Sequence, residues 1–331
     1  MSEEKAVQTR SQDQQPLIRV EHLKKYFQVA RGKVLHAVDD VSFSIPRGTT
    51  LGLVGESGCG KTTVGRTLVR LYEPDGGKIL FDGEDISKVR GKERRELTRR
   101  MQMVYQDPYA SLNPFFTVGE IITEGLEIHG IGSDKKERME IAYDLLEKVG
   151  LHREHANRFP HEFSGGQRQR VGLARSLAVN PDFIVCDEAI SALDVSVQAQ
   201  IVNMLVDFQQ SMGLTYLFIA HDLSMVRYIS DRTAVMYLGS LVEIGNVSDI
   251  YSHPAHPYTQ GLLQAVPVAD PDYEKARSGE TVMAGEVASP INPGPGCRFC
   301  SRCPRATERC KNETPILRDL GGGHMAACHN L

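Results

Sequence analysis

The sequence predicts an α/β fold in which buried strands deliver polar residues to one edge of a sheet. Three apolar runs support this prediction, and each ends in a turn or in charged residues. Ligands of open α/β sheets gather at the carboxyl ends of the strands. The three runs are residues 50–54, which enter a glycine-rich turn, Phe183–Cys186, which ends in Asp187 and Glu188, and residues 214–220, which end in His221.

The glycine-rich turn has the pattern Gly55-x-x-x-x-Gly60-Lys61-Thr62, typical of a phosphate-binding loop. Glycines at 55, 58 and 60 allow φ > 0, so that successive N–H groups can face one anion. The following helix, with Val64, Leu68 and Leu71 on one face, offers its positive end to phosphate. The alternative is an ordinary turn. The predicted nucleotide contacts are Gly55, Glu56, Ser57, Gly58, Cys59, Gly60, Lys61, Thr62 and Thr63.

Chain length, net charge and the length of the apolar runs restrict the class of protein. A chain of 331 residues suggests one large domain with an appendage. The formal net charge of −4 gives no indication of nucleic-acid binding. No stretch approaches the roughly 18 uninterrupted apolar residues of a membrane span, and the N-terminus lacks an apolar signal core. We therefore expect a cytoplasmic protein whose role at a membrane would require partner chains.

Several further elements follow from local pattern. Alternation in His36–Ile45 predicts a strand with one solvated face, and residues 78–83 form another short strand. Gly91–Arg100 reads as a charged helix. Residues 115–159 read as a helical insert: Asp134 and Glu137 resemble a capping box, and Gly150 ends the apolar helical spacing. Further helices are expected over Arg168–Val179 and Gln198–Met212, and two short strands between Thr233 and Ile244.

Two motifs beyond the loop carry a resemblance to a known family. They are Phe163-Ser-Gly-Gly-Gln-Arg-Gln-Arg170 and Phe183-Ile-Val-Cys-Asp-Glu-Ala-Ile-Ser-Ala-Leu-Asp194, followed by His221. From about Leu17 onward the chain resembles the ATPase subunit of an ATP-binding cassette (ABC) transporter. The phrase His256-Pro-Tyr-Thr259 and the tail resemble the dipeptide/oligopeptide importer branch.

The resemblance implies a P-loop NTPase core of ABC type with an antiparallel β-subdomain, a helical subdomain and a small Cys-rich C-terminal appendage. The expected boundaries are a disordered leader at 1–16, a nucleotide-binding domain at 17–262, with its helical subdomain at about 107–180, and a peptide-importer C-terminal region at 263–331.

The resemblance also implies catalytic roles. Thr62 and Gln106 would contact Mg²⁺, Asp187 would hold it through water, and Glu188 would act as general base or orient the water. His221 would contact the γ-phosphate and hold the glutamate in line. Where the family often has proline after this glutamate, the chain has Ala189, which we expect to change backbone stiffness rather than chemistry.

An aromatic ring near Lys25-Tyr26-Phe27 would stack on adenine, and the family pattern favours Phe27. The alternative is that either ring packs into the core.

The segment Ser164-Gly165-Gly166-Gln167 opens a helix and forms a second anion-binding end. One triphosphate does not need two such ends in one chain. In the family, two ATPase subunits pair head to tail, so that each signature caps the γ-phosphate on the other's loop. Asp194 would belong to the loop that signals between the paired subunits.

Five of the seven cysteines lie in the last 35 residues, which indicates metal or cluster ligation rather than disulfides in a cytoplasmic protein. Both zinc and an iron–sulfur cluster take four thiolates. The resemblance implies a [4Fe–4S] cluster on Cys297, Cys303, Cys310 and Cys328. It favours iron–sulfur over zinc and zinc over free thiols. Cys300 is an additional thiol that leaves one ligand open.

The combined expectation is an ATP-hydrolysing, Mg²⁺-dependent subunit that powers import of dipeptides or oligopeptides, peripheral on the cytoplasmic face of the membrane. Its expected partners are a second, paralogous ATPase subunit, two transmembrane permease subunits and an extracytoplasmic peptide-binding protein, with no nucleic acid. Two alternatives remain: a soluble ABC ATPase acting on nucleic acid or ribosomes, and a metal-sensing regulatory ABC subunit.

Overall fold

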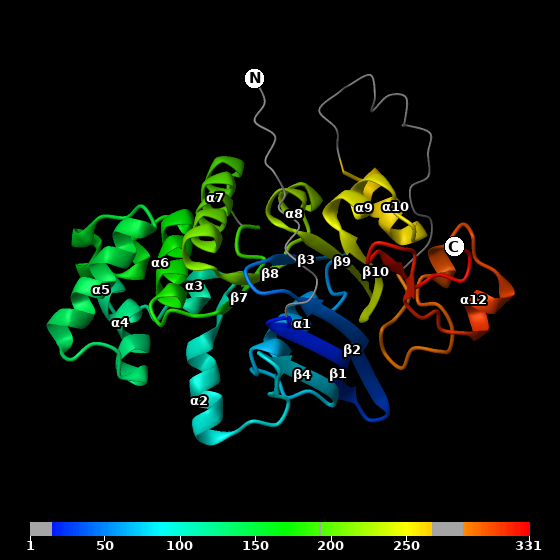
Figure 1. Cartoon of the computed structure of the whole chain (residues 1–331), viewed down its shortest axis with the longest axis horizontal. Coiled ribbons are helices and arrows are strands. Elements are labelled where there is room, and N and C mark those ends of the chain that lie inside the picture. The colour runs from blue at the N-terminus through cyan, green and yellow to red at the C-terminus, as the bar shows by residue number, and fades with distance from the viewer. Residues whose placement is uncertain (1–14, 192, 267–286) are drawn as a thin grey trace, which may run out of the picture.

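The computed structural model describes residues 15–191, 193–266 and 287–331. The expected leader lies outside the described residues up to position 14, and so does much of the proline- and charge-rich stretch after residue 266. In Figure 1 helices α7 (Val195–Met212) and α8 (Leu223–Ile229) cover one face of a central sheet. Helix α1 (Lys61–Leu68) and a second sheet lie on the other face.

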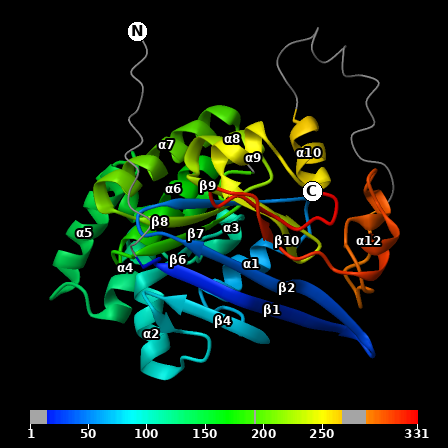
Figure 2. The same cartoon turned by 45° about the vertical axis from the view of Figure 1, so that its right-hand side comes forward.

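The second sheet is antiparallel, with the strand order β2-β1-β4-β5 in the described part of the chain. Its buried side chains, among them Val20, Val41 and Phe81, pack toward α1 and the central sheet in one apolar core. The two longest strands form a hairpin whose tip reaches the C-terminal part, where Val34 N–H donates to Asn292 (Figure 2). The strands are β1 (Ile18–Ala30), β2 (Lys33–Ile45), β4 (Gly76–Phe81) and β5 (Glu84–Asp85).

The central sheet has the order β11-β12-β10-β9-β3-β8-β7-β6 among the described residues, and its members from β9 to β6 are parallel. The predicted strands at 50–54, 183–186 and 214–220 are β3, β7 and β8, which lie side by side in the order β3-β8-β7, so their carboxyl ends meet at one edge. The strands are β3 (Thr50–Val54), β6 (Met101–Val104), β7 (Phe183–Asp187), β8 (Thr215–Ile219), β9 (Arg232–Tyr237), β10 (Ser240–Asn246), β11 (Arg318–Asp319) and β12 (Met325–Ala326).

Two glycines show how closely the helices approach this sheet. A Cβ at Gly65 in α1 would lie 2.8 Å from a methyl of Val185, and one at Gly52 in β3 would lie 2.4 Å from a methyl of Val226 in α8. Both faces of the sheet are therefore covered, which explains why its parallel strands read as continuous apolar runs.

The helical part lies at one end of the molecule (Figure 1). The helix over Val118–His129 begins with a capping box between Thr117 and Glu120. The helices of this part bury an apolar core that includes Ile122 and Leu146. The elements are α2 (Gly91–Arg100), α3 (Pro108–Ser111), α4 (Val118–His129), α5 (Lys135–Lys148), the 3-10 turns η1 (Arg153–Asn157) and η2 (Pro160–Glu162), and α6 (Gly165–Leu177).

Some local predictions need correction. The Asp134 side chain caps α5, but the Glu137 carboxylate accepts from Ser133 N–H instead of closing a box with Asp134. Helix α6 begins at Gly165 rather than Arg168, and α7 begins at Val195 rather than Gln198. Helix α1 ends at Leu68, so Leu71 lies beyond it and is 48% exposed.

The C-terminal part packs on the edge of the central sheet, where β12 pairs with β10. There the fully buried Glu243 carboxylate accepts from His324 Nε2 at 2.7 Å and from the backbone of Ala255 and His256. In the residues that the structure describes, no helix is long and apolar enough to cross a membrane. The remaining elements are α9 (Val247–Ser252), α10 (Pro257–Gln264), the 3-10 turn η3 (Cys300–Arg302) and α12 (Glu308–Asn312).

Candidate nucleotide-binding and hydrolysis site

The predicted phosphate loop connects β3 to α1, and its glycines adopt left-handed backbone conformations. Gly55, Gly58 and Gly60 have φ values of 150°, 78° and 109°. A Cβ at Gly60 would lie 2.0 Å from the carbonyl oxygen of Ala37, and one at Gly55 would lie 2.2 Å from that of Met236. Only glycine fits these two positions, because the loop is wedged against the backbone of β2 and β9.

Lys61 lies at the centre of this loop and is almost completely buried. Its ammonium donates to the carbonyl oxygens of Gly55 at 2.8 Å and Glu56 at 3.0 Å, and lies 4.0 Å from Glu188 Oε1. A buried cation held this way places a fixed positive charge beside the loop N–H groups, as phosphate binding requires.

The Thr62 hydroxyl donates to Asp187 Oδ1 at 2.7 Å, which joins the start of α1 to the end of β7. Asp187 is only 1% exposed, and its second oxygen, Oδ2, is buried without a hydrogen-bond partner. Burial raises the pKa of Asp187, against the opposing effect of the Thr62 hydrogen bond. An orphaned carboxylate oxygen next to a hydroxyl fits a Mg²⁺ site, since this ion takes oxygen ligands and would restore the missing interaction.

Glu188 follows directly and has φ of 46°, a strained value for a residue other than glycine. Its Oε2 accepts from Gln106 Nε2 at 2.7 Å, across 82 positions of sequence. The same oxygen lies 4.0 Å from His221 Nδ1, and the His221 side chain is largely exposed at the end of β8. The three predicted catalytic residues are therefore gathered at one edge of the sheet, around one carboxylate.

Glu188 and Gln106 border a cavity of about 230 Å³ between the loop and β2, and His221 is not among the described residues that line it. Phe27 lines it and packs edge-on against Tyr72, whereas the Tyr26 hydroxyl is turned to Asp39 at 2.5 Å. The position of Phe27 is thus compatible with its predicted contact to adenine. The predicted residues along this cavity are Phe27, Ser57, Gly58, Cys59, Gly60, Lys61, Thr62, Thr63, Gln106 and Glu188.

Ser164, Gly165, Gly166, Gln167 and Asp194 are not among the described residues that line this cavity. They lie at the starts of two neighbouring helices: Ser164 caps α6 in a capping box with Gln167, and Asp194 caps α7. A Cβ at Gly166 would lie 2.7 Å from Val197, so the two helix ends are packed together. Ser164, Gly165 and Asp194 are exposed.

The five C-terminal cysteines lie within one segment of the chain, residues 297–328. Cys297 N–H donates to the carbonyl of Cys310, and the Asn330 amides lie 3.4 Å from Cys328 Sγ and 3.7 Å from Cys310 Sγ. Thiols with nearby N–H donors are suitable cluster ligands. However, no group of three or more His, Cys, Asp or Glu side chains in the described part of the chain has a geometry that could hold a metal ion. The predicted four-thiolate site is therefore not confirmed.

Several residues around the loop could not be anticipated from motifs. Arg302 donates to both carboxylate oxygens of Glu56 at 3.0 Å, and Tyr258 accepts from the Glu56 N–H at 2.9 Å. Gly239 and Pro290 line the cavity itself. The only sequence signal for any of them was the phrase containing Tyr258.

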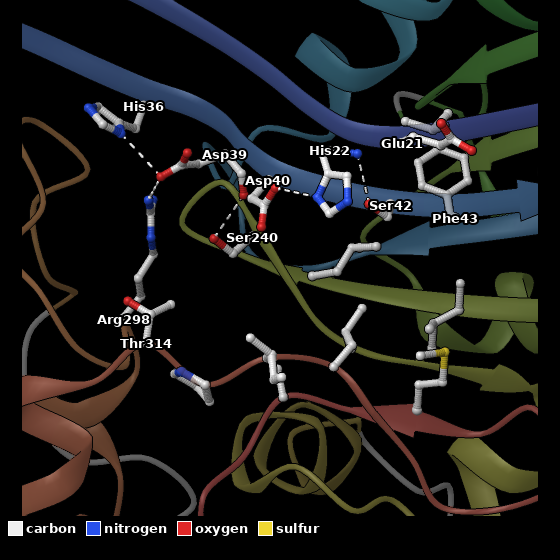
Figure 3. A pocket seen from close by; sticks show the side chains of 18 of the residues that line it. Glu21, His22, His36, Asp39, Asp40, Ser42, Phe43, Ser240, Arg298 and Thr314 are labelled. Carbon is white, nitrogen blue, oxygen red and sulfur yellow. Dashed lines mark hydrogen bonds and ion pairs between the residues drawn. The ribbon is translucent and has the colours of Figure 1, made fainter. Parts of the chain in front are cut away.

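A larger groove of about 1050 Å³ lies elsewhere, between β2 and the C-terminal residues (Figure 3). It is bordered by His22, Asp40, Phe43 and Ile316, and by none of the predicted catalytic residues within the described chain. Its size alone therefore does not identify it as the reaction site.

Comparison with known proteins agrees with this geometry. Residues 38–191 match the family described as ABC transporter, and residues 242–310 match the oligopeptide/dipeptide transporter, C-terminal region. The chain is 51% identical to the putative oligopeptide transport ATP-binding protein YkfD of Bacillus subtilis, covering 95% of each. It is 60% identical to the oligopeptide transport ATP-binding protein OppF of the same organism, covering 79% of this chain and 86% of that protein.

Solved structures of ATP-binding cassettes share the fold of this chain. A dimeric ATP-binding cassette in a post-hydrolysis state with ADP and Pi superposes with a TM-score of 0.65 at 26% identity, covering 70% of this chain and 98% of that one. The CbiO1 protein of Clostridium perfringens, part of an ABC transporter complex, superposes with a TM-score of 0.64 at 25% identity, covering 72% and 92%. The predicted α/β core with its antiparallel and helical subdomains is confirmed.

Proposed function

The chain belongs to the family of ATP-binding subunits of oligopeptide and dipeptide ABC transporters, and on that premise we propose that it hydrolyses ATP to power peptide import. The observation that carries the proposal is the group formed by Lys61, Thr62, Asp187, Glu188 and Gln106, which come from the loop after β3 and from the ends of β6 and β7.

Each residue has a task in this proposal. The loop N–H groups and Lys61 hold the β- and γ-phosphates. Thr62 and Asp187 would hold Mg²⁺, with Gln106 beside them; the ion, when bound, screens the negative charge of the phosphates. Glu188 accepts the proton of the attacking water, and the Gln106 amide keeps its carboxylate oriented through the 2.7 Å contact. His221 is placed to reach the γ-phosphate from the same side.

The test is ATP turnover of a Glu188→Gln variant in the assembled transporter. Loss of a general base lowers a rate about 10²- to 10⁴-fold, whereas the amide should leave nucleotide binding intact. Glu84→Gln, an exposed carboxylate on β5, is the matched control and should keep wild-type turnover. Equal turnover of Glu188→Gln and wild type would remove Glu188 from the mechanism.

We propose that a second ATPase subunit completes the site. The exposed Ser164 and Gly165 at the start of α6 and the exposed Asp194 and Val195 form the surface that faces it. The solved relatives described as dimeric cassettes support this arrangement. The opposite subunit is proposed to be a paralogous chain paired head to tail.

We propose further that permease subunits dock on the helical part, which would place this chain at the cytoplasmic face of the membrane. A groove of about 690 Å³ runs between β6, α3 and α4, next to Gln106, and Tyr109 and Phe115 expose their rings nearby in sequence. A partner seated there would contact the Gln106 loop directly. Co-purification with two detergent-solubilised membrane proteins and a peptide-binding protein tests this. Recovery with ribosomes or nucleic acid instead would favour a soluble ABC protein.

The [4Fe–4S] cluster stays a proposal, with zinc as the alternative. Cys297, Cys303, Cys310 and Cys328 would supply the thiolates, and Cys300 would be dispensable. Iron, sulfide and zinc contents of anaerobically purified protein test this, with Cys300→Ser as the control for Cys303→Ser. Iron lost only in Cys303→Ser supports the assignment. Protein without iron and zinc contradicts it.

A further inference from the structure

The second residue of the phosphate loop, Glu56, is held from outside the nucleotide-binding core. Arg302 NH1 donates to both carboxylate oxygens of Glu56 at 3.0 Å. The two residues are 246 positions apart, and Arg302 belongs to η3, between two of the cysteines. The Arg302 side chain is 9% exposed and that of Glu56 is 28% exposed, so the ion pair is partly shielded from solvent.

The other polar groups of Glu56 are also occupied. Its N–H donates to the hydroxyl of Tyr258 at 2.9 Å, and its carbonyl accepts from Lys61 Nζ at 3.0 Å. Tyr258 is fully buried and packs against Phe299, with ring centroids 5.4 Å apart. Glu56 is therefore contacted by Arg302 and Tyr258, which lie outside the nucleotide-binding motifs, as well as by the phosphate-binding Lys61.

A second arginine of the same segment contacts a neighbour of the cavity. Arg298 donates to the carboxylate of Asp39 (Figure 3). It also donates to the carbonyl of Leu238, which precedes the cavity residue Gly239. Asp39 also contacts His36 at 3.2 Å, and His36 lines the nucleotide cavity. Arg298 and Arg302 thus contact residues that adjoin the cavity lining, although neither arginine belongs to a nucleotide-binding motif.

The charge on Glu56 explains why such a contact would matter. A carboxylate within a loop that binds a polyanion repels its ligand unless a cation neutralises it. Arg302 is the cation that the structure places on this carboxylate. We propose that Arg302 is a positioning residue for nucleotide binding, which neutralises and fixes Glu56 and so couples the cysteine segment to the phosphate loop. This rests on the proposed ATP site.

The test measures the dissociation constant of a non-hydrolysable imido analogue of ATP with Mg²⁺, by calorimetry on the full chain. Arg302→Gln should weaken binding about fivefold, equivalent to about 1 kcal/mol. Arg302→Lys keeps the charge and should stay within about twofold of wild type. Arg305→Gln is the matched control, because Arg305 contacts Gln260 rather than the loop.

The decisive variant is Arg302→Gln combined with Glu56→Gln. Removing both charges should restore affinity to within about twofold of wild type, which a purely structural role of Arg302 would not produce. Glu56→Gln alone removes the repelling charge and leaves the Arg302 cation, so it should bind the analogue more tightly than wild type. It tests the charge argument even if Arg302→Gln misfolds.

Unchanged affinity in Arg302→Gln, no recovery in the double variant, or binding in Glu56→Gln that is no tighter than in wild type would each overturn the inference. Failure of the wild-type chain to bind the analogue would instead contradict the proposed function.

Discussion

His256 is expected to make the stability of this protein depend on pH in a defined window. The side chain is only 1% exposed, at the start of α10, and its Nδ1 accepts from Tyr258 N–H at 3.1 Å. Burial lowers the pKa of His256 from 6.5 to about 4. The folded protein therefore keeps this ring neutral, whereas the unfolded chain protonates it below about pH 6.5.

The sign follows from proton binding. Between about pH 6.5 and pH 4 the unfolded state binds more protons at His256, so the free energy of unfolding falls as the pH falls through this window. A pKa lowered from 6.5 to about 4 corresponds to a loss of about 3 kcal/mol once the lower pH is reached. Above pH 6.5 this contribution is constant.

The assay compares wild type with His256→Asn by denaturant unfolding at several pH values from 4.5 to 7.5. Asparagine can still accept from the Tyr258 N–H but does not titrate. The variant should lose about 1–2 kcal/mol at every pH through poorer packing, and should show a shallower fall in stability below about pH 6.5. Other histidines titrate equally in both proteins and cancel. Identical pH slopes would refute the reasoning.

Two further substitutions test contacts described above. His324→Ala leaves the buried Glu243 carboxylate without its histidine, and should cost about 3 kcal/mol, lowering the calorimetric Tm by roughly 4 °C; an unchanged Tm would contradict the pairing. Gly60→Ala would place a Cβ 2.0 Å from the carbonyl oxygen of Ala37 and should abolish nucleotide binding. Gly32→Ala, the control, is also at positive φ but has open space around it and should retain binding. Equal nucleotide affinities of the two variants, measured by calorimetry, would contradict the loop geometry.

The phosphate loop and the acidic strand could be predicted because each is a continuous motif. A run such as Phe183–Asp187 fixes a buried strand, and its position in the sheet then places Asp187 at the edge where Thr62 also lies. The role of Gln106 depends on the fold, because a single glutamine carries little information in sequence until the fold brings it to Glu188.

Other features depend on contacts that sequence does not encode locally. Arg302 lies in a segment without periodicity, so nothing in the sequence connects it to Glu56. The end of α1 was misplaced because Leu71 continues the apolar spacing after the helix has stopped. For the cysteines, spacing identifies donors such as Cys303 and Cys310, but ligation requires a geometry that spacing does not determine.

A reaction site divided between two subunits explains why Ser164 lies away from the phosphate loop of its own chain. The first N–H groups of a helix have no partner within it, and at α6 the capping box satisfies those of Gln167 and Ser164. The exposed start of α6 can therefore bind an anion presented from outside the chain, whereas the buried Lys61 serves the anion in its own loop. If a facing subunit presents that anion, Ser164 and Glu188 of one chain act on two different ATP molecules. A single chain would then contribute half of each reaction centre, because its Lys61 and its Ser164 would bind different nucleotides.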